Sequence, residues 1–368
     1  MTMYKGIMLA IVWLVIVNLL GLIGLNRLNL HPDTAYVWML AHPYEQSQSW
    51  NMVGMHARWD SDWYQSIARE GYHQDPGNTL SNLVFFPLYP SLLRVGTFIM
   101  GGDDVLAGWL ISSLFLVLAC GVLVRLVEKF HPEANPLLVG FLLLLFPTAF
   151  FLNAVYTESL FLLLSLLTFY LTLEKKYFFA GLIGFLAALT RVTGVLLFFP
   201  LLLQILHTEG YRISSLKKAW PLALIPFGTA LFFAYHWVAF GDPWLFFKIE
   251  SAWGRSFTPN MEHFTFFSRA AIINFSLDSL FLIFGIVMIV VLMKRKWYPY
   301  AVYLASTLGV AVASGTLMSI GRYSLVLFPV YIVGASLKSE VARYTWIALS
   351  TMLFTLITIL FVNGYWAG

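Results

Sequence analysis

The sequence HARWDSDWYQSIAREGY, residues 56–72, gathers charged residues in a chain that is only 11% charged. On a helix, residues three and four apart share a face. Asp60, Trp63 and Tyr64 therefore lie on one face of a helix over this stretch, and Asp62 lies on another. We predict an interfacial helix that holds a carboxylate at the edge of a membrane.

The composition of the whole chain is that of a membrane protein. Of 368 residues, 60% are hydrophobic and 17% aromatic, and the mean hydropathy is +0.78. We therefore expect apolar runs of spanning length along the whole chain instead of one soluble core. The net charge of +4 fits lysines in cytoplasmic loops and is no sign of nucleic-acid binding. The single cysteine, Cys120, lies in an apolar run, which predicts neither a disulfide nor a thiol metal site.

Apolar runs predict the membrane spans. The first run is longer than the hydrophobic part of a signal peptide and lacks a small-x-small cleavage site, so we expect it to remain as the first span. Thirty apolar residues at 177–206 are too long for one span and short for two, which predicts a hairpin broken at TRVTG, residues 190–194. The first run is residues 7–25. The remaining predicted spans are residues 105–126, 136–153, 159–173, 220–240, 271–293, 299–314, 323–337 and 344–362.

The lysines set the predicted topology. Residues 26–104 form the first outer loop, and the run 84–100 within it is short and contains Arg94, so we predict a juxtamembrane or re-entrant helix. If this helix does not cross, the short-loop lysines fall on the side of Lys5, and Lys248 is the only lysine opposite. The positive-inside rule favours that arrangement. It gives about eleven crossings in one membrane domain, residues 1–368, with a cytoplasmic amino terminus.

In this topology the unusual polar residues fall on the outer side. Ionisable groups at membrane depth are costly, so their convergence predicts an anionic ligand and a general base. The residues concerned are Asp60, Asp62, Glu158, Arg191, Lys248, Arg255, Arg322 and Tyr323.

These residues also have structural interpretations. The structural alternative for Asp60 is a solvated loop acid that pairs with Arg58 or Arg69. For Glu158 it is the favourable end of a helix dipole, and for Arg322 it is snorkelling to the interface. The histidines of the outer loop contain no HxxxH pair, so we predict no zinc site. They are His31, His42, His56 and His73.

Five motifs in order carry a resemblance to a known family. They are RWDSDWY (58–64), FFPLYP (85–90), FPTAFFLNAVYTESLF (146–161), LTRVTGVLL (189–197) and GRYSLVLFP (321–329). Together they resemble the PIG-V type of mannosyltransferase in its prokaryotic form. The resemblance implies a GT-C fold and transfer of a sugar from a polyprenyl-phosphate donor on the non-cytoplasmic side of the plasma membrane. It also implies a catalytic aspartate in the first loop, which matches Asp60.

The chemistry of such a donor fits the polar residues. Guanidinium groups bind a lipid phosphate bidentately without a metal, so Arg191 and Arg322 are the predicted phosphate ligands, and we predict no cofactor. Asp60 is the predicted base for the acceptor hydroxyl, and general-base catalysis contributes about 10²–10⁴-fold. Direct attack inverts the anomeric centre. The other predicted substrate-binding residues are Trp59, Asp62, Trp63, Tyr64, Glu158 and Tyr323.

Two other functions remain open from the sequence. A transporter or flippase of a lipid-linked sugar also needs arginines in a cavity, and it predicts polar residues at several depths with paired discontinuous helices. A structural subunit of a membrane complex leaves Asp60, Arg191 and Arg322 without a role. The acceptor is not identified by any of these residues.

Overall fold

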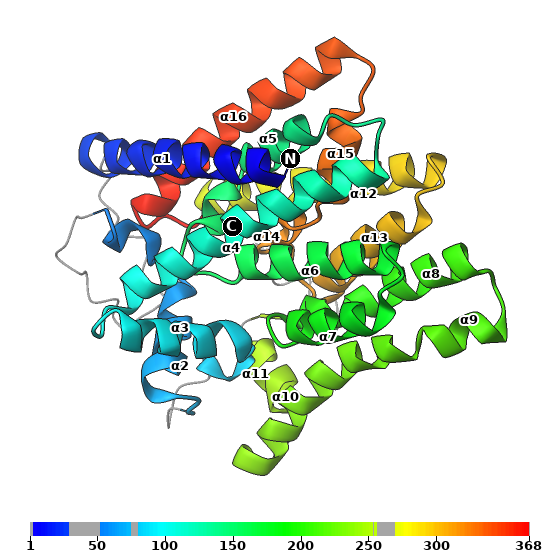
Figure 1. Ribbon diagram of the computed structural model, residues 1–368. Coiled ribbons are helices and arrows are strands. Elements are labelled where there is room, and N and C mark those ends of the chain that lie inside the picture. The colour runs from blue at the N-terminus through cyan, green and yellow to red at the C-terminus, as the bar shows by residue number, and fades with distance from the viewer. Residues whose placement is uncertain (1–2, 29–51, 75–79, 253, 256–268, 368) are drawn as a thin grey trace. The chain divides into compact units, whose positions relative to one another are not determined.

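The computed structural model describes residues 3–28, 52–74, 80–252, 254–255 and 269–367, and all regular structure within these ranges is helical (Figure 1). This confirms the all-α prediction. His31, His42 and the polar stretch 45–50 lie outside the described residues. The chain divides into two compact units. Unit 1 comprises Met1–His73, Tyr89–Leu163 and Gly334–Gly368, and unit 2 comprises Gln74–Leu88 and Leu164–Val333.

Unit 1 is built around the packing of its first long helix. In Figure 1, α1 lies against α4 and α16. A Cβ added to Gly6 of α1 would lie 2.5 Å from the carbonyl oxygen of Cys120 in α4, so only glycine allows this approach. Cys120 is fully buried there, as the packing interpretation predicts. The helices are α1 (Met3–Arg27), η2 (Gly54–His56), α2 (Ser61–Glu70), most of α3 (Leu88–Ile99), α4 (Asp104–Phe130), α5 (Pro136–Leu144), η4 (Ala149–Leu152), the start of α6 (Glu158–Leu173) and α16 (Glu340–Val362).

Unit 2 contains the predicted hairpin. Its break is confirmed, because α7 ends at Ala188 and the next helix begins at Val192. A Cβ on Gly194 would lie 2.3 Å from the Ala187 carbonyl oxygen, so the glycine permits the turn. The helices are η3 (Asn82–Val84), most of α6, α7 (Tyr177–Ala188), η5 (Val192–Leu197), α8 (Phe198–Glu209), α9 (Ile213–Lys218), η6 (Trp220–Ala223), α10 (Leu224–Phe240), α11 (Leu245–Ala252), α12 (Arg269–Lys294), α13 (Tyr298–Ala313), α14 (Ile320–Leu325) and most of α15 (Pro329–Ala335).

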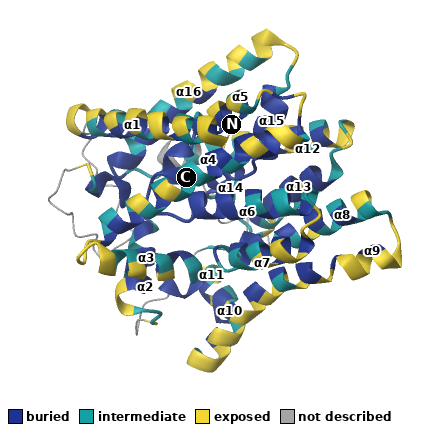
Figure 2. Cartoon of the chain, in the orientation of Figure 1, coloured by how far each residue is buried: buried dark blue, intermediate teal, exposed yellow. Residues whose placement is uncertain are grey.

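Six helices in the described part of the chain are long and apolar enough to span a membrane. Many residues of α1 and α16 are exposed, as the yellow segments of Figure 2 show, and most of these exposed residues are large and apolar. This is expected of surfaces that contact lipid. The six helices are Met3–Arg27, Asp104–Phe130, Val192–Glu209, Trp220–Phe240, Ile273–Lys294 and Glu340–Val362. The chain is thus an all-α protein of the multi-pass membrane type.

Two predicted spans are wrong as continuous helices. The run 136–153 forms α5, which ends at Leu144, and then the short η4; the run 323–337 divides between α14 and α15. Each run contains a proline, Pro147 or Pro329. Proline lacks the backbone donor and disfavours helical geometry in the residue before it. Hydropathy does not register these interruptions, because both sides of each proline are apolar.

The run 84–100 contains only short helices. It forms η3 and the twelve-residue α3, which at 1.5 Å per residue is about 18 Å long against a hydrocarbon core of about 30 Å. Phe98 on α3 is 88% exposed and Ile99 is 66% exposed. A short helix with a bare apolar face is suited to lie at the membrane interface.

Candidate functional site

Helix α2 forms where the sequence predicts it and faces as predicted. Its buried side includes Trp63, Tyr64 and Ile67, whereas Asp62 is half-buried. Asp60 is the residue that precedes the first turn, and it is half-buried. The helix ends at Gly71, which adopts a φ of 88° that favours glycine.

The backbone around Asp60 is fixed by a tyrosine that the sequence analysis did not single out. The Tyr156 hydroxyl donates to the Arg58 carbonyl at 2.9 Å and accepts from the Asp60 N–H at 3.1 Å. Between these residues, Trp59 has a φ of 57°, a left-handed conformation that is costly for a bulky side chain. Such strain persists only where the surroundings over-determine it, and it concentrates at functional sites.

Trp59 and Arg58 are also tied to the distant segment that follows α16. The Trp59 indole N–H donates to the Tyr365 carbonyl at 3.2 Å, and its ring meets the edge of Trp366 with centroids 5.0 Å apart. Arg58 donates twice to the carbonyl of Val362, the last residue of α16, at 3.0 and 3.2 Å. A guanidinium satisfies the orphan carbonyls of a helix end and complements its dipole. Trp59 is only 3% exposed, and its contacts attach the chain before α2 to the segment that follows α16.

The acidic partner of Arg69 lies at the start of α4. Asp104 binds the Arg69 guanidinium and accepts a hydrogen bond from Gln65 at 3.0 Å. This attaches α2 to α4. The bond to Asp104 raises the pKa of Arg69 above its ordinary value.

Glu158 occupies the first position of α6 and is fully buried. This is the favourable end of the helix dipole for an anion, as the structural interpretation predicts. Tyr64 packs edge-on to Tyr89 and Tyr156, with ring centroids 5.3 and 6.1 Å apart. The motif 146–161 thus contains both Glu158 and Tyr156, the residue whose hydroxyl fixes the backbone on either side of Trp59.

A buried polar network lies behind this loop. His56 is fully buried, with Nε2 2.8 Å from Asn18 Oδ1 and 3.0 Å from Asn153 Nδ2. The oxygen of Asn153 accepts from the Trp109 indole at 3.1 Å and from Ser113 at 3.0 Å. Because the indole is only a donor, it fixes the amide with its nitrogen toward the imidazole. Burial lowers the pKa of His56 to about 3, so the ring is neutral and structural.

The predicted phosphate ligands Arg191 and Arg322 are in unit 2, where Arg191 contacts a second tyrosine. The Arg191 guanidinium lies over the Tyr323 ring, 5.2 Å from its centroid. The Tyr323 hydroxyl accepts from Arg255 at 3.3 Å, and Arg255 pairs with Glu250 at 3.6 Å. Arg191 is half-buried at the hairpin break, as predicted. Two guanidinium groups therefore contact one aromatic side chain, and guanidinium groups bind carboxylates and phosphates bidentately.

Arg322 is buried within α14, only 4% exposed. The span predicted to begin at Tyr323 is absent, so Arg322 does not mark the outer end of a span. The backbone of Gly321 bonds to the carboxylate of Asp278 in α12. Asp278 is the one acid in the apolar run 271–293, and the cost of a carboxylate at membrane depth is the signal that identifies it from sequence. Among the described residues, no three His, Cys, Asp or Glu side chains gather as a metal site.

The structure thus places six predicted site residues in unit 1 and three in unit 2. The first group is Trp59, Asp60, Asp62, Trp63, Tyr64 and Glu158, and the second is Arg191, Arg322 and Tyr323. No protein-family model matches the chain, and no match was found among curated proteins or among solved structures.

Proposed function

We propose that the chain is an inverting glycosyltransferase. It takes a sugar, mannose by the motif resemblance, from a polyprenyl-phosphate donor and passes it to a hydroxyl acceptor. The proposal includes a GT-C fold with about eleven crossings, a cytoplasmic amino terminus and a reaction on the outer side of the plasma membrane. The motifs and the lysine distribution support it.

The observation that carries the proposal is the over-determined position of Asp60. A half-buried carboxylate follows a strained Trp59, and one hydroxyl bonds to the backbone on both sides of it. A general base needs a carboxylate fixed in place, within hydrogen-bond reach of the proton that it takes. A carboxylate that only improves solubility needs no such support.

In the proposed reaction, the acceptor oxygen attacks the anomeric carbon while the bond to the donor phosphate oxygen breaks. The hydroxyl proton passes to Asp60, and polyprenyl phosphate leaves with the bonding electrons. Arg191 and Arg322 bind that phosphate, and Tyr323 holds Arg191 through its ring. Bidentate guanidinium contacts stabilise the charge that develops on the leaving oxygen. Tyr64, Glu158 and Asp62 bind sugar and acceptor hydroxyls.

The test is a transfer assay with purified protein in lipid nanodiscs, polyprenyl-phosphate mannose and a panel of hydroxyl acceptors. Asp60→Asn keeps the side-chain size and removes the base, so turnover is expected to fall by about a hundredfold or more. Glu70→Gln, an exposed carboxylate at the other end of α2, is the matched control and should transfer at the wild-type rate. Asp60→Asn with wild-type turnover would remove Asp60 from the mechanism.

A transporter of a lipid-linked sugar is the second candidate, and specific observations favour it. Arg191 sits at the break of one discontinuous helix pair, and Arg322 belongs to another, α14 and α15. Asp278 adds a carboxylate inside a spanning helix. Discontinuous helices and intramembrane charges are typical of transporters. Reconstituted protein that moved labelled lipid between leaflets, without a glycosylated product from any acceptor, would establish the transporter.

A further inference from the structure

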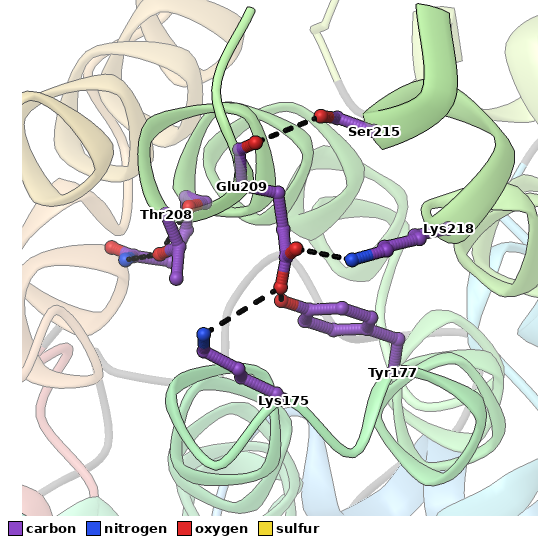
Figure 3. A network of polar contacts seen from close by, with 7 residues as sticks. Lys175, Tyr177, Thr208, Glu209, Ser215 and Lys218 are labelled. Carbon is purple, nitrogen blue, oxygen red and sulfur yellow. Dashed lines mark hydrogen bonds and ion pairs between the residues drawn. The ribbon is translucent and has the colours of Figure 1, made fainter. Parts of the chain in front are cut away.

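The end of the α7 and α8 hairpin opposite Arg191 has its own charge cluster. Figure 3 shows the Glu209 side chain between two lysines and a tyrosine. Its carboxylate pairs with Lys175 at 3.8 Å and with Lys218, and accepts from the Tyr177 hydroxyl at 2.8 Å. The Ser215 hydroxyl donates to the Glu209 backbone carbonyl at 3.3 Å. One carboxylate therefore joins the start of α7, the end of α8 and helix α9.

Basic residues outnumber acidic residues at this corner. Lys175 and Lys218 pair with Glu209. Two chain segments, residues 174–177 and 209–218, also contain the exposed Lys176, Arg212 and Lys217. Glu174 is the other acid in these segments. The corner is therefore positively charged overall, and the bound Glu209 carboxylate shows that its lysines can converge on an anion.

Large apolar side chains are exposed beside these charges. The rings of Phe178 and Trp220 lie 6.5 Å apart and connect the start of α7 to η6, although Trp220 is 63% exposed. Ile213 in α9 is 76% exposed, and Phe179 is also exposed. Aromatic rings are enriched at the headgroup level of membranes, where lysines interact with anionic lipids. Exposed apolar groups and basic groups are therefore combined here as at a membrane surface.

We propose that this corner binds the phosphate headgroup of anionic phospholipids. The binding surface, called here the basic corner, comprises Lys176, Arg212 and Lys217 with Phe178 and Trp220. Within the corner, the Glu209 backbone carbonyl bonds to Ser215 of α9, and the Glu209 carboxylate occupies Lys175 and Lys218 as an internal anion. The apolar side chains enter the acyl boundary while the basic groups contact phosphate. The inference is independent of the proposed enzymatic function, since α7 separates this end of the hairpin from Arg191 by twelve residues, about 18 Å.

The experiment is native mass spectrometry of the delipidated full chain in detergent, titrated with phosphatidylglycerol or phosphatidylcholine. Wild-type protein should retain phosphatidylglycerol in preference. A basic residue near an anionic surface contributes about fivefold in affinity, so Lys176→Gln with Lys217→Gln should weaken the preferred binding by about 25-fold. Lys5→Gln with Lys338→Gln removes the same charge from exposed positions elsewhere and should bind within about twofold of wild type.

A second variant tests the role of the internal anion. Glu209→Gln removes the negative charge that occupies Lys175 and Lys218, so phosphatidylglycerol should bind several-fold more tightly. Equal retention of both lipids by wild-type protein would overturn the proposal. So would wild-type affinity in the double lysine variant of the basic corner, or a loss equal to that of the control pair.

Discussion

Tyr156→Phe removes one oxygen that bonds to the backbone on both sides of the strained Trp59. Tyr156 is 1% exposed, so water does not replace the lost partner freely. Each hydrogen bond contributes about 1 kcal/mol net, so the two amount to about 2 kcal/mol. If most of this free energy stabilises the transition state by holding Asp60 in position, its loss should lower kcat about tenfold or somewhat more, since about 1.4 kcal/mol is a factor of ten. Donor KM should remain unchanged.

The matched control is Tyr89→Phe. Tyr89 is equally buried in the same unit, and its hydroxyl bonds to Ser112 at 3.0 Å and to the Gly108 carbonyl at 3.4 Å. Both variants should lower the melting temperature by a similar amount, and only Tyr156→Phe should lower kcat in the mannose-transfer assay. Equal losses of kcat in the two variants, or none in Tyr156→Phe, would refute a positioning role for Tyr156.

Three further outcomes are expected. Burial holds the pKa of His56 near 3 against 6.5 in the unfolded chain, so the unfolded state binds the extra proton, and this site should cost about 2 kcal/mol of stability between pH 7 and pH 5. His56→Gln should show a shallower fall of melting temperature over that range. Gly194→Ala should destabilise by about 1–3 kcal/mol in thermal unfolding because its Cβ meets backbone, whereas Gly309→Ala, with open space around it, should not. Cysteines at Glu70 and Lys217 in a cysteine-free background should react with impermeant maleimide from opposite sides of oriented vesicles.

Each of these outcomes has a contrary result. An identical pH dependence in His56→Gln would show that His56 is already protonated when folded or not buried. Equal melting temperatures for Gly194→Ala and Gly309→Ala would mean that the hairpin turn has room for a side chain. Labelling of both engineered cysteines from one side would overturn the proposed topology and, with it, the outer location of Asp60.

Local sequence patterns predicted the features that depend on neighbouring residues. The faces of α2 follow from spacings of three and four, and the break near Arg191 follows from the length of the apolar run and from Gly194. The divided spans at Pro147 and Pro329 were missed because hydropathy is averaged over windows that the prolines scarcely change. A proline in the middle of an apolar run, far from either end, is the sequence signal for such an interruption.

Support for the candidate site depends on residues far apart in the chain. Tyr156 and Asp60 are separated by 96 positions, and Asn18 and Asn153 by 135. Spacing rules apply to residues a few positions apart, so they do not identify pairs this distant in a single sequence. Trp59 illustrates the same limit, because its left-handed backbone contradicts local preference and is stabilised by tertiary contacts alone. Asp278, by contrast, was visible as an acid in an apolar run.

The bonds from Arg58 and Trp59 to Val362 and Tyr365 also determine when the first loop reaches its final form during biosynthesis. The partners are separated by 304 and 306 positions. A nascent chain that lacks α16 lacks the carbonyls that these side chains bind, so the Tyr156 hydroxyl holds the strained turn before Asp60 without those contacts. The turn therefore gains its full set of contacts only after α16 has been translated and has docked. A translation product that ends before α16 contains Asp60 but lacks the contacts of Arg58 and Trp59 with Val362 and Tyr365.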